Sequence, residues 1–268
     1  MRDGLLKREL AVVSPELAGI PSPAEQSSRY TLSLARHEQD VRAAQRLRHL
    51  VFVEELGARF SAPLDGYERD DLDEHCDHLL VRETGTGAVV GTCRLLLPRS
   101  AAAAGRLDAE SVFDLSGHAR IHGDLVEISR ACLHPAHRGG VLVPLLTLGV
   151  ARYVLAAGHA WVGGKCMVPL GENGELAFSV WQLVAPGHLC PEEYRVSPRI
   201  PLRRSDVTAP SDPCLIPPLV RGALSLGAWV CGEPAYEPRL DAAALYALMP
   251  MHRVDPVLLQ DLPDLSAS

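Results

Sequence analysis

Two apolar, β-rich segments of this chain carry ionisable side chains in their interiors. Residues 125–133 contain Glu127 and Arg130 among Leu, Val and Ile, and a second segment contains Arg94. Burying an unpaired charge is costly, so charges in two apolar strands indicate a shared network of ion pairs. Alternation places Glu127 and Ser129 on one face and Arg130 on the other, unless a bulge intervenes. The alternative is a half-exposed sheet whose charges meet solvent.

Hydrophobic periodicity elsewhere predicts alternating helices and strands. Helices are expected at residues 40–56, 141–157, 172–184, 217–226 and 241–248, with a short helical turn at 101–104. Strands are expected at residues 78–83, 88–97, 125–133, 160–168, 193–202 and 228–231, the first two joined as a hairpin by residues 84–87. Gly163 and Gly164 within one strand indicate a bulge or a close approach of another element. This order predicts an α/β fold, a mixed sheet flanked by helices.

A length of 268 residues allows one large domain with short appendages. Residues 1–29, rich in proline and polar side chains, are expected to be a loose leader. Residues 30–250 are expected to form a single domain and residues 251–268 a tail. Residues 203–213, polar and proline-containing, are expected to be mobile.

Charge and cysteine content exclude several classes of protein. A net charge of −7 argues against a nucleic-acid partner. Seven cysteines without a Cys-x-x-Cys pair indicate free thiols, hence a reducing, cytoplasmic setting. No segment approaches the roughly 18 apolar residues of a membrane span, so contact with the inner face of the membrane would be peripheral at most. No metal site is expected, because the neighbouring His75, Cys76 and His78 would point to opposite faces of a strand.

An ordered series of motifs carries a family resemblance. The series is Arg48-x-x-x-Phe52, Glu68-x-Asp70-x-x-Asp73, Cys93-Arg94-Leu95-Leu96, Phe113 and Glu127-x-Ser129-Arg130. It resembles the acyl-homoserine-lactone synthases, and still more the ornithine lipid synthase-type N-acyltransferases. Cys132-x-His134-Pro135-x-x-Arg138 and Ile216-Pro217-Pro218-Leu219 are similar to the lipid-synthase branch. Together these motifs span about residues 40–245.

The resemblance implies the GNAT fold, a mixed, mostly antiparallel sheet flanked by helices. Two central strands splay apart in that fold, and the donor's pantetheine arm lies in the gap. It implies no tightly bound cofactor, with acyl-phosphopantetheine on acyl carrier protein or coenzyme A as co-substrate. The acceptor would be the amine of an amino acid such as ornithine, acylated by a fatty or 3-hydroxy fatty chain.

The resemblance also assigns chemical roles. Glu127 would be the general base, acting directly or through a water, because an α-amine is mostly protonated near neutral pH. Arg130 would share the catalytic centre with it. Backbone N–H groups at Ala131 and Cys132 would stabilise the thioester oxyanion.

Further positions would bind the two substrates. Leu133, Arg138, Gly139 and Gly140 would complete the thioester and phosphopantetheine site, where a helix N-terminus favours an anion. Residues expected to bind the acceptor or to form an ion-pair network are Arg48, Asp70, Asp73, Arg94 and Ser129. Residues expected to line the acyl pocket are Phe52 and Phe113.

Departures from the family pattern keep alternatives open. Ser129 and Ala131 stand where lipid synthases usually have Gly and Ser, and Ser129 matches the lactone-synthase form. One alternative is therefore a lactone synthase using S-adenosylmethionine. Others are acylation of a peptide or natural-product amine, and a non-catalytic acyl-binding protein.

The donor partner is expected to be acyl carrier protein. The loop at residues 134–140 has few glycines, which favours a carrier with one phosphate over coenzyme A with several. Basic residues suggested to meet the carrier are Arg138, Arg152, Lys165 and Arg203.

Overall fold

A central eight-stranded sheet organises the protein, in a computed structural model that describes residues 29–59, 65–138, 140–202 and 212–259. The strand order is β1 (Tyr30–Leu34), β2 (Asp77–Glu83), β3 (Val89–Leu96), β5 (Leu125–Leu133), β6 (Trp161–Val168), β10 (Ala242–Pro250) and β8 (Trp229–Val230), with β9 (Ala235–Glu237) also on β10. A small second sheet pairs β4 (Phe113–Asp114) with β7 (Ser197–Pro198). Strands β5 and β6 run parallel, whereas the other neighbours in the large sheet are antiparallel. The expected mixed, mostly antiparallel sheet is confirmed.

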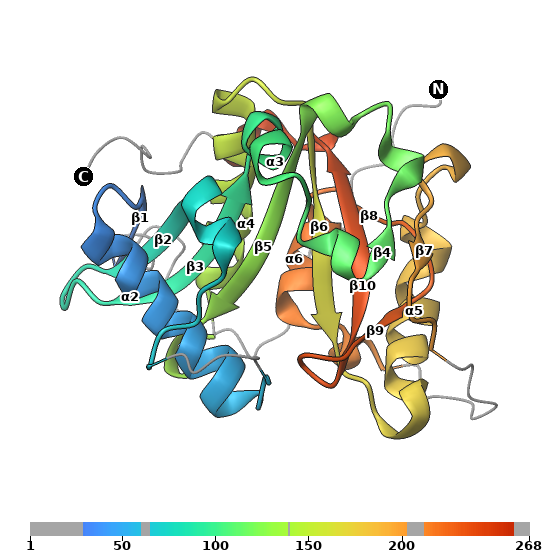
Figure 1. The fold of residues 1–268 in the computed structure, drawn as a ribbon, viewed down its shortest axis with the longest axis horizontal. Helices are drawn as coiled ribbons and strands as arrows, with labels where there is room; N and C mark the ends of the chain where they lie inside the picture. Colours follow the sequence, from blue (N-terminus) through green and yellow to red (C-terminus); the bar gives the residue numbers. More distant parts are fainter. Residues whose placement is uncertain (1–28, 60–64, 139, 203–211, 260–268) are drawn as a thin grey trace, which may run out of the picture.

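Helices cover both faces of this sheet (Figure 1). They are α2 (Glu38–Arg48) with a π-helix at His49–Glu55, α3 (Pro98–Ala104), α4 (Leu142–Ala156), α5 (Glu175–His188) and α6 (Pro218–Ser225). Helix α2 packs on one face of β2 and β3, and α4 packs on the other. The largest hydrophobic core lies under α4, where Leu146 and Val150 meet Leu79 and Leu95 of the sheet.

The two central strands separate part-way along their length. Backbone pairing between β5 and β6 runs from Leu125 opposite Trp161 to Glu127 opposite Gly163, and stops there. A Cβ on Gly164 would lie 2.1 Å from the carbonyl oxygen of Ile128. The glycine pair therefore allows the close approach that the sequence indicated, and the expected splay is present (Figure 1).

A bulge interrupts β5 just beyond this point. Ser129 faces Arg94 and Cys132 faces Thr92, so two residues of β5 oppose one residue of β3. Arg130 takes up the extra length with a left-handed φ of 52°. Alternation placed Arg130 on the face opposite Glu127 and Ser129 only if β5 had no bulge. Because the bulge is present, that placement does not apply to Arg130.

Two expected elements are wrong. The segment expected as a helix at 241–248 is β10, which pairs with β6 along one edge and with β8 and β9 along the other. A short apolar run does not separate a doubly buried strand from a helix. In the strand expected at 193–202, the first two residues belong to a 3-10 turn, Glu192–Tyr194, and the strand is reduced to the two-residue β7.

Other expectations concern the ends of the chain. Strand β1 at the start of the predicted domain was missed, although it pairs along its whole length with β2. The expected leader, apart from Arg29, and residues 203–211 lie outside the described residues, as does the end of the tail. The described part of the tail forms two short 3-10 helices, Met251–Arg253 and Pro256–Leu259.

The close approach of Gly164 to β5 gives a stability test. We expect Gly164→Ala to lower the free energy of unfolding by roughly 1–3 kcal/mol, because the added methyl group would overpack a site bounded by backbone. Urea unfolding measures the change. Gly85→Ala is the matched control, since no atom lies within 4 Å of its new Cβ. Equal midpoints for the two variants would contradict this account of the splay.

Candidate active site

An apolar cavity of about 360 Å³ lies between the separated ends of β5 and β6. Its walls are formed by residues 128–133 of β5 and 162–167 of β6, with side chains from the π-helix, α4, α6 and β10. Phe52, Val150 and Ala223 are among the apolar residues on these walls. The space that the strands leave open therefore suits an extended, largely apolar ligand.

A network of ion pairs borders the cavity on the α2 side. Arg48 is fully buried and donates from Nε to Glu68 Oε2 at 2.6 Å and from Nη1 to Asp73 Oδ1 at 2.7 Å. Arg94 is also fully buried, donating to Asp70 and, at 3.1 Å, to Ser129 Oγ. Each buried cation thus has charged or polar partners, as burial requires.

Arg130 is the centre of this network. Its Nε donates to Glu68 Oε1 at 2.8 Å, its Nη2 to Asp70 Oδ2 at 2.8 Å, and its Nη1 to Asp108 Oδ1 at 3.0 Å. The left-handed bulge carries the side chain to the face where Arg94 and Ser129 also lie. All three guanidinium nitrogens are engaged, so Arg130 holds the site together.

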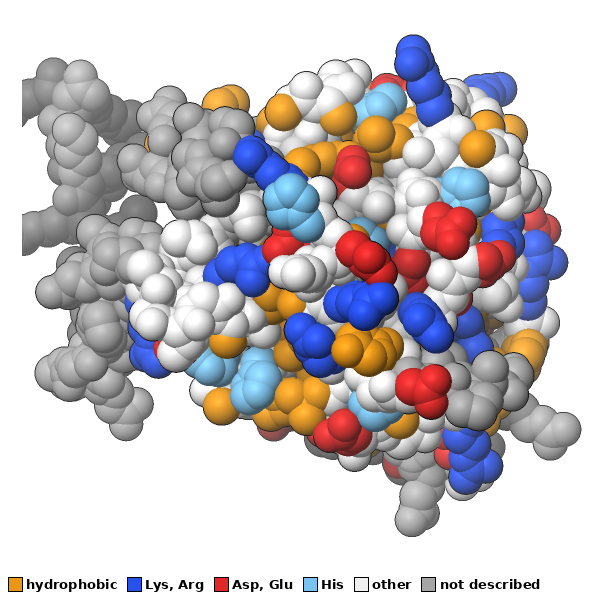
Figure 2. All heavy atoms as spheres, turned by 60° about the vertical axis from the view of Figure 1, so that its left-hand side comes forward, with side chains coloured by type: hydrophobic (Ala, Val, Ile, Leu, Met, Phe, Trp, Pro, Cys, Tyr) orange, Lys and Arg blue, Asp and Glu red, His pale blue; other side chains and the backbone are white. Residues whose placement is uncertain are grey.

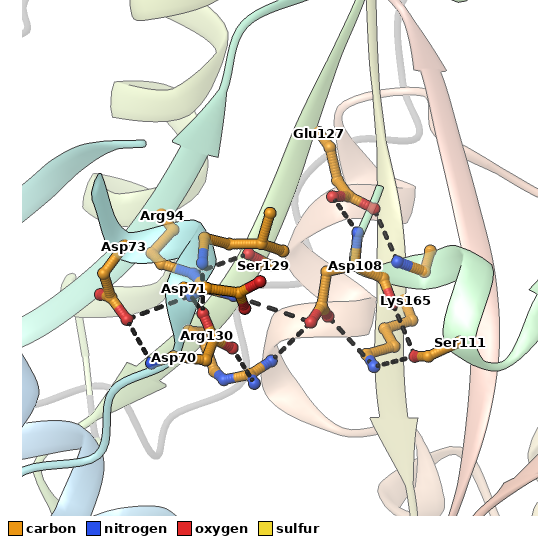
Figure 3. A network of polar contacts seen from close by, with 12 residues as sticks. Asp70, Asp71, Asp73, Arg94, Asp108, Ser111, Glu127, Ser129, Arg130 and Lys165 are labelled. Carbon is orange, nitrogen blue, oxygen red and sulfur yellow. Dashed lines mark hydrogen bonds and ion pairs between the residues drawn. The ribbon is translucent and has the colours of Figure 1, made fainter. Parts of the chain in front are cut away.

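Asp108 connects the two separated strands (Figure 3). One carboxylate oxygen accepts from Arg130 of β5, and the other lies 3.0 Å from Lys165 Nζ of β6. Lys165 also donates at 2.9 Å to Glu237, which in turn pairs with Arg239. A chain of opposite charges therefore spans the gap between the strands.

Glu127 occupies a different position from the other charges. Its side chain is 1% exposed, and it accepts from the backbone N–H of Asp108 at 2.6 Å and of Ala109 at 2.8 Å. Burial, together with the negative charge of Asp108, raises the pKa of Glu127 to about 7. It does not line the cavity, so in this arrangement its carboxylate orients the segment that carries Asp108.

The charges of the network are balanced without Glu127. The ion pairs join five cations to five carboxylates: Arg48, Arg94, Arg130, Lys165 and Arg239 with Glu68, Asp70, Asp73, Asp108 and Glu237. An ionised Glu127 would add an uncompensated negative charge, which agrees with its raised pKa.

The predicted donor residues are mostly on the cavity. Ala131, Cys132, Leu133 and Arg138 line it, and Gly140 lies in the turn before α4. Gly139 lies outside the described residues. Arg138 forms a bidentate pair with Glu55 and is 40% exposed.

Phe113 does not line the cavity, in contrast to the prediction, whereas Phe52 does. Phe113 is fully buried and packs edge-on against Tyr246 in a separate core cluster. Lys165, suggested as a carrier contact, is wrong in that role because its ion pairs bury it. Arg203 lies outside the described residues.

Sequence reasoning missed Asp108, Glu237 and Arg239 and gave Glu68 no role. Asp108 lies in a loop before a 3-10 turn and Glu237 ends the three-residue strand β9, so at neither position does an apolar run make a charge conspicuous. Lys165, like Arg94, is a charged residue inside a β-rich run. A buried lysine requires acidic partners, so this signal could have pointed to Asp108 and Glu237.

Comparison with known proteins identifies the family. The family model described as an acetyltransferase (GNAT) domain matches residues 47–148. An L-ornithine N(alpha)-acyltransferase of Rhodobacter capsulatus is 33% identical over 254 residues, covering 88% of this chain and 92% of the relative. This chain belongs to the L-ornithine N(alpha)-acyltransferase family. The relative of that name from Agrobacterium fabrum is 31% identical over 217 residues, 73% of this chain and 72% of its own.

This acyltransferase has the GNAT fold. The acyl-homoserine lactone synthase BjaI, solved with SAM and isopentyl-CoA, superposes with a TM-score of 0.54. It is 20% identical, and the match covers 88% of this chain and 92% of the synthase. At that identity the likeness shows the fold alone.

None of the helices in the described part of the acyltransferase is long and apolar enough to cross a membrane. No three His, Cys, Asp or Glu side chains gather there as a metal site would require.

The ion pairs make stability depend on pH in two opposite ways. Burial opposes ionisation of Asp73 and Glu237, yet Arg48 and Arg239 outweigh it and lower both pKa values to about 2. Their stabilisation is present above the ordinary carboxyl pKa and is lost as pH falls toward 2. The raised pKa of Glu127 acts oppositely, giving stability below pH 4.5 that is lost as pH rises through about 7.

We therefore expect the free energy of unfolding to fall below about pH 4. Glu127 should contribute a separate decline between about pH 5 and 8, opposed by His78 and His118, whose pKa values burial lowers. Urea unfolding across this range measures both limbs. Glu127→Gln should remove only the Glu127 contribution, since glutamine does not titrate. A variant with the wild-type slope between pH 5 and 8 would show that Glu127 does not titrate there.

Proposed function

We propose that this acyltransferase moves a fatty or 3-hydroxy fatty acyl group from an acyl carrier protein thioester to the α-amine of ornithine. The observation that carries the proposal is the apolar cavity between β5 and β6, which ends on a fixed, charge-balanced network. An acyl chain needs an apolar cavity, and an amino acid needs paired charges. The curated relatives, named as L-ornithine N(alpha)-acyltransferases, support ornithine as the acceptor.

The open edge of β5 supports a pantetheine-bound donor. Beyond Glu127, β5 has no backbone pairing with β6, so its edge facing β6 lies along the cavity. Unpaired strand edges bind extended ligands through main-chain hydrogen bonds. The amide groups of a pantetheine arm would pair there, with the thioester carbonyl near the N–H groups of Ala131 and Cys132.

Glu127 remains our proposed general base, with a water between it and the amine. Its carboxylate does not reach the cavity wall, so it would accept the proton through that water and not directly from the amine. A pKa of about 7 suits it to take a proton near neutral pH. Arg130, fixed by three carboxylates, would keep Ser129 and the oxyanion donors in place.

The carrier remains the proposed donor, although Lys165, one of the basic residues expected to meet it, is buried. On the face that carries α2 and β1, basic and acidic side chains are intermingled (Figure 2). Lys165 is buried in the network, whereas Arg138, at 40% exposed, and Arg152, half-buried on α4, remain proposed contacts for the carrier. The described cysteines are free, which supports a reducing, cytoplasmic setting for the enzyme.

The function is tested by product analysis. The purified enzyme is incubated with matched acyl-carrier protein or acyl-CoA and with ornithine, S-adenosylmethionine or a peptide amine. We expect N-acylornithine by mass spectrometry, formed faster from the carrier. A lactone from S-adenosylmethionine would replace the proposal with the lactone-synthase function. Consumption of no thioester with any amine would reject the enzymatic function altogether.

Glu127→Gln tests the proposed base. We expect kcat/KM to fall roughly 10²-fold, the usual effect of losing a general base. The wild-type kcat/KM should rise with pH and level off above about 7, because only the ionised carboxylate accepts a proton. The variant should lack this inflection while retaining native circular dichroism. An unchanged profile would assign Glu127 to orienting Asp108 only.

A further inference from the structure

One buried ion pair on the cavity wall has no part in the steps described above. Glu237 ends β9, and Arg239 follows in the turn before β10. Both line the cavity, and Glu237 is the sole carboxylate among the described residues that do so. Any cationic group of a ligand in this cavity therefore has one anionic partner on the wall.

The two partners of Glu237 hold it unequally. Lys165 Nζ lies 2.9 Å from Oε2, within the usual range of about 2.7–2.9 Å for charge-assisted hydrogen bonds. Arg239 is slightly farther, at 3.1 Å from Nε to Oε1 and 3.2 Å from Nη2 to Oε2. The side chain of Arg239 is 39% exposed, against 3% for Glu237. Lys165 is only 7% exposed, so of these two partners Arg239 is the one whose guanidinium a ligand in the cavity can reach.

Other arginines near the cavity are less suited to bind a carboxylate. Arg130 uses all three nitrogens on carboxylates, and Arg94 is fully buried. Arg138, at the donor end, also uses all three nitrogens: two donate to Glu55 and Nε donates to the carbonyl oxygen of Leu133. Arg239, by contrast, has no hydrogen-bond partner for Nη1 among the described residues and retains a donor for a ligand.

An amino acid with a charged side chain fits between Arg239 and Glu237 without leaving a charge unpaired. Its carboxylate would pair with the guanidinium of Arg239, and its side-chain ammonium would pair with Glu237. Two ion pairs with the ligand would then replace the one between Arg239 and Glu237. Burial of charge is tolerated when every member stays paired. The α-amine then remains unengaged and can meet the thioester.

We propose that Glu237 and Arg239 form the acceptor subsite, in which Arg239 binds the α-carboxylate and Glu237 binds the side-chain ammonium of a diamino acid. The assignment rests on the proposed function, because it takes an amino acid as acceptor. Lys165 and Asp108 position Glu237 and connect the subsite to Arg130. Selectivity for a diamino acid over a neutral one would thus originate at Glu237.

A competition assay tests the Glu237 half. The enzyme receives equal ornithine and norvaline, which has the same carbon skeleton without the second amine, and the ratio of acylated products is measured. We expect Glu237→Gln to lower that ratio roughly 10- to 100-fold, the effect of losing a hydrogen bond to a charged group. The control Glu83→Gln removes the carboxylate of an Arg29 pair outside the cavity and should keep the wild-type ratio.

Arg239→Gln tests the proposed binding of the α-carboxylate. The side chain of Arg239 is exposed enough for the substitution to be tolerated. We expect a raised KM for ornithine and for norvaline alike, with little change in kcat. Ornithine amide, which lacks the carboxylate, should show the same KM with variant and wild type. A KM for the amide that rises as much as that for ornithine would overturn this role.

The possible results distinguish a failure of the acceptor subsite from a failure of the proposed function on which it rests. A wild-type enzyme that acylates ornithine, with an unchanged product ratio in Glu237→Gln, overturns the subsite and leaves the function standing. Equal losses on ornithine and norvaline show that Glu237 is structural and also overturn it. A wild-type enzyme that acylates no amino acid overturns both. Melting temperatures verify folding, and if Glu237→Gln is unfolded, the Arg239→Gln result decides the proposal.

Discussion

The ion pairs of Asp108 with Arg130 and Lys165 hold the protein together where its backbone pairing ends. Beyond Glu127 and Gly163 the two central strands share no ladder, yet their side chains remain tied through one carboxylate. The opening between them is therefore rigidly bounded and remains available to a ligand. Loss of Asp108 would leave two buried cations facing each other, which costs more than the pair itself contributes.

Glu127 has a structural role in the fold and, in the function proposed above, a chemical role as well. Its two hydrogen bonds from Asp108 and Ala109 fix the segment on which that bridge depends. The same burial and the same neighbour raise its pKa into the range where a proton is gained or lost near neutrality. A carboxylate at the cavity surface would be easier for the acceptor's amine to reach. It would also be fully ionised near neutral pH and would then stabilise the ammonium form of the acceptor, which cannot attack the thioester.

Much of the sheet and half of the site could be predicted from local sequence. Charges inside apolar runs identified Arg94, Glu127 and Arg130, and a glycine pair identified the close approach of the central strands. Strand β10 was mistaken for a helix because both its edges and both its faces are buried, which removes the alternation that marks a strand. Asp108 escaped notice because turns carry charges routinely, and Glu237 because the three-residue strand β9 is too short to show alternation; only tertiary packing buries these two.

The pairing of β6 with β10 has a consequence for the order of folding. The pair of this ladder nearest in sequence is Val168 opposite Ala243, 75 positions apart in the chain (243 − 168), whereas β2 and β3 form a local hairpin. Long-range pairing forms slowly because the entropic cost of closing the loop arises before the contacts of the ladder can offset it. During refolding, the layer of β1, β2, β3 and α2 would collapse early, while the wall bearing Glu237 would be added last. Regain of substrate selectivity would then lag behind regain of bulk structure.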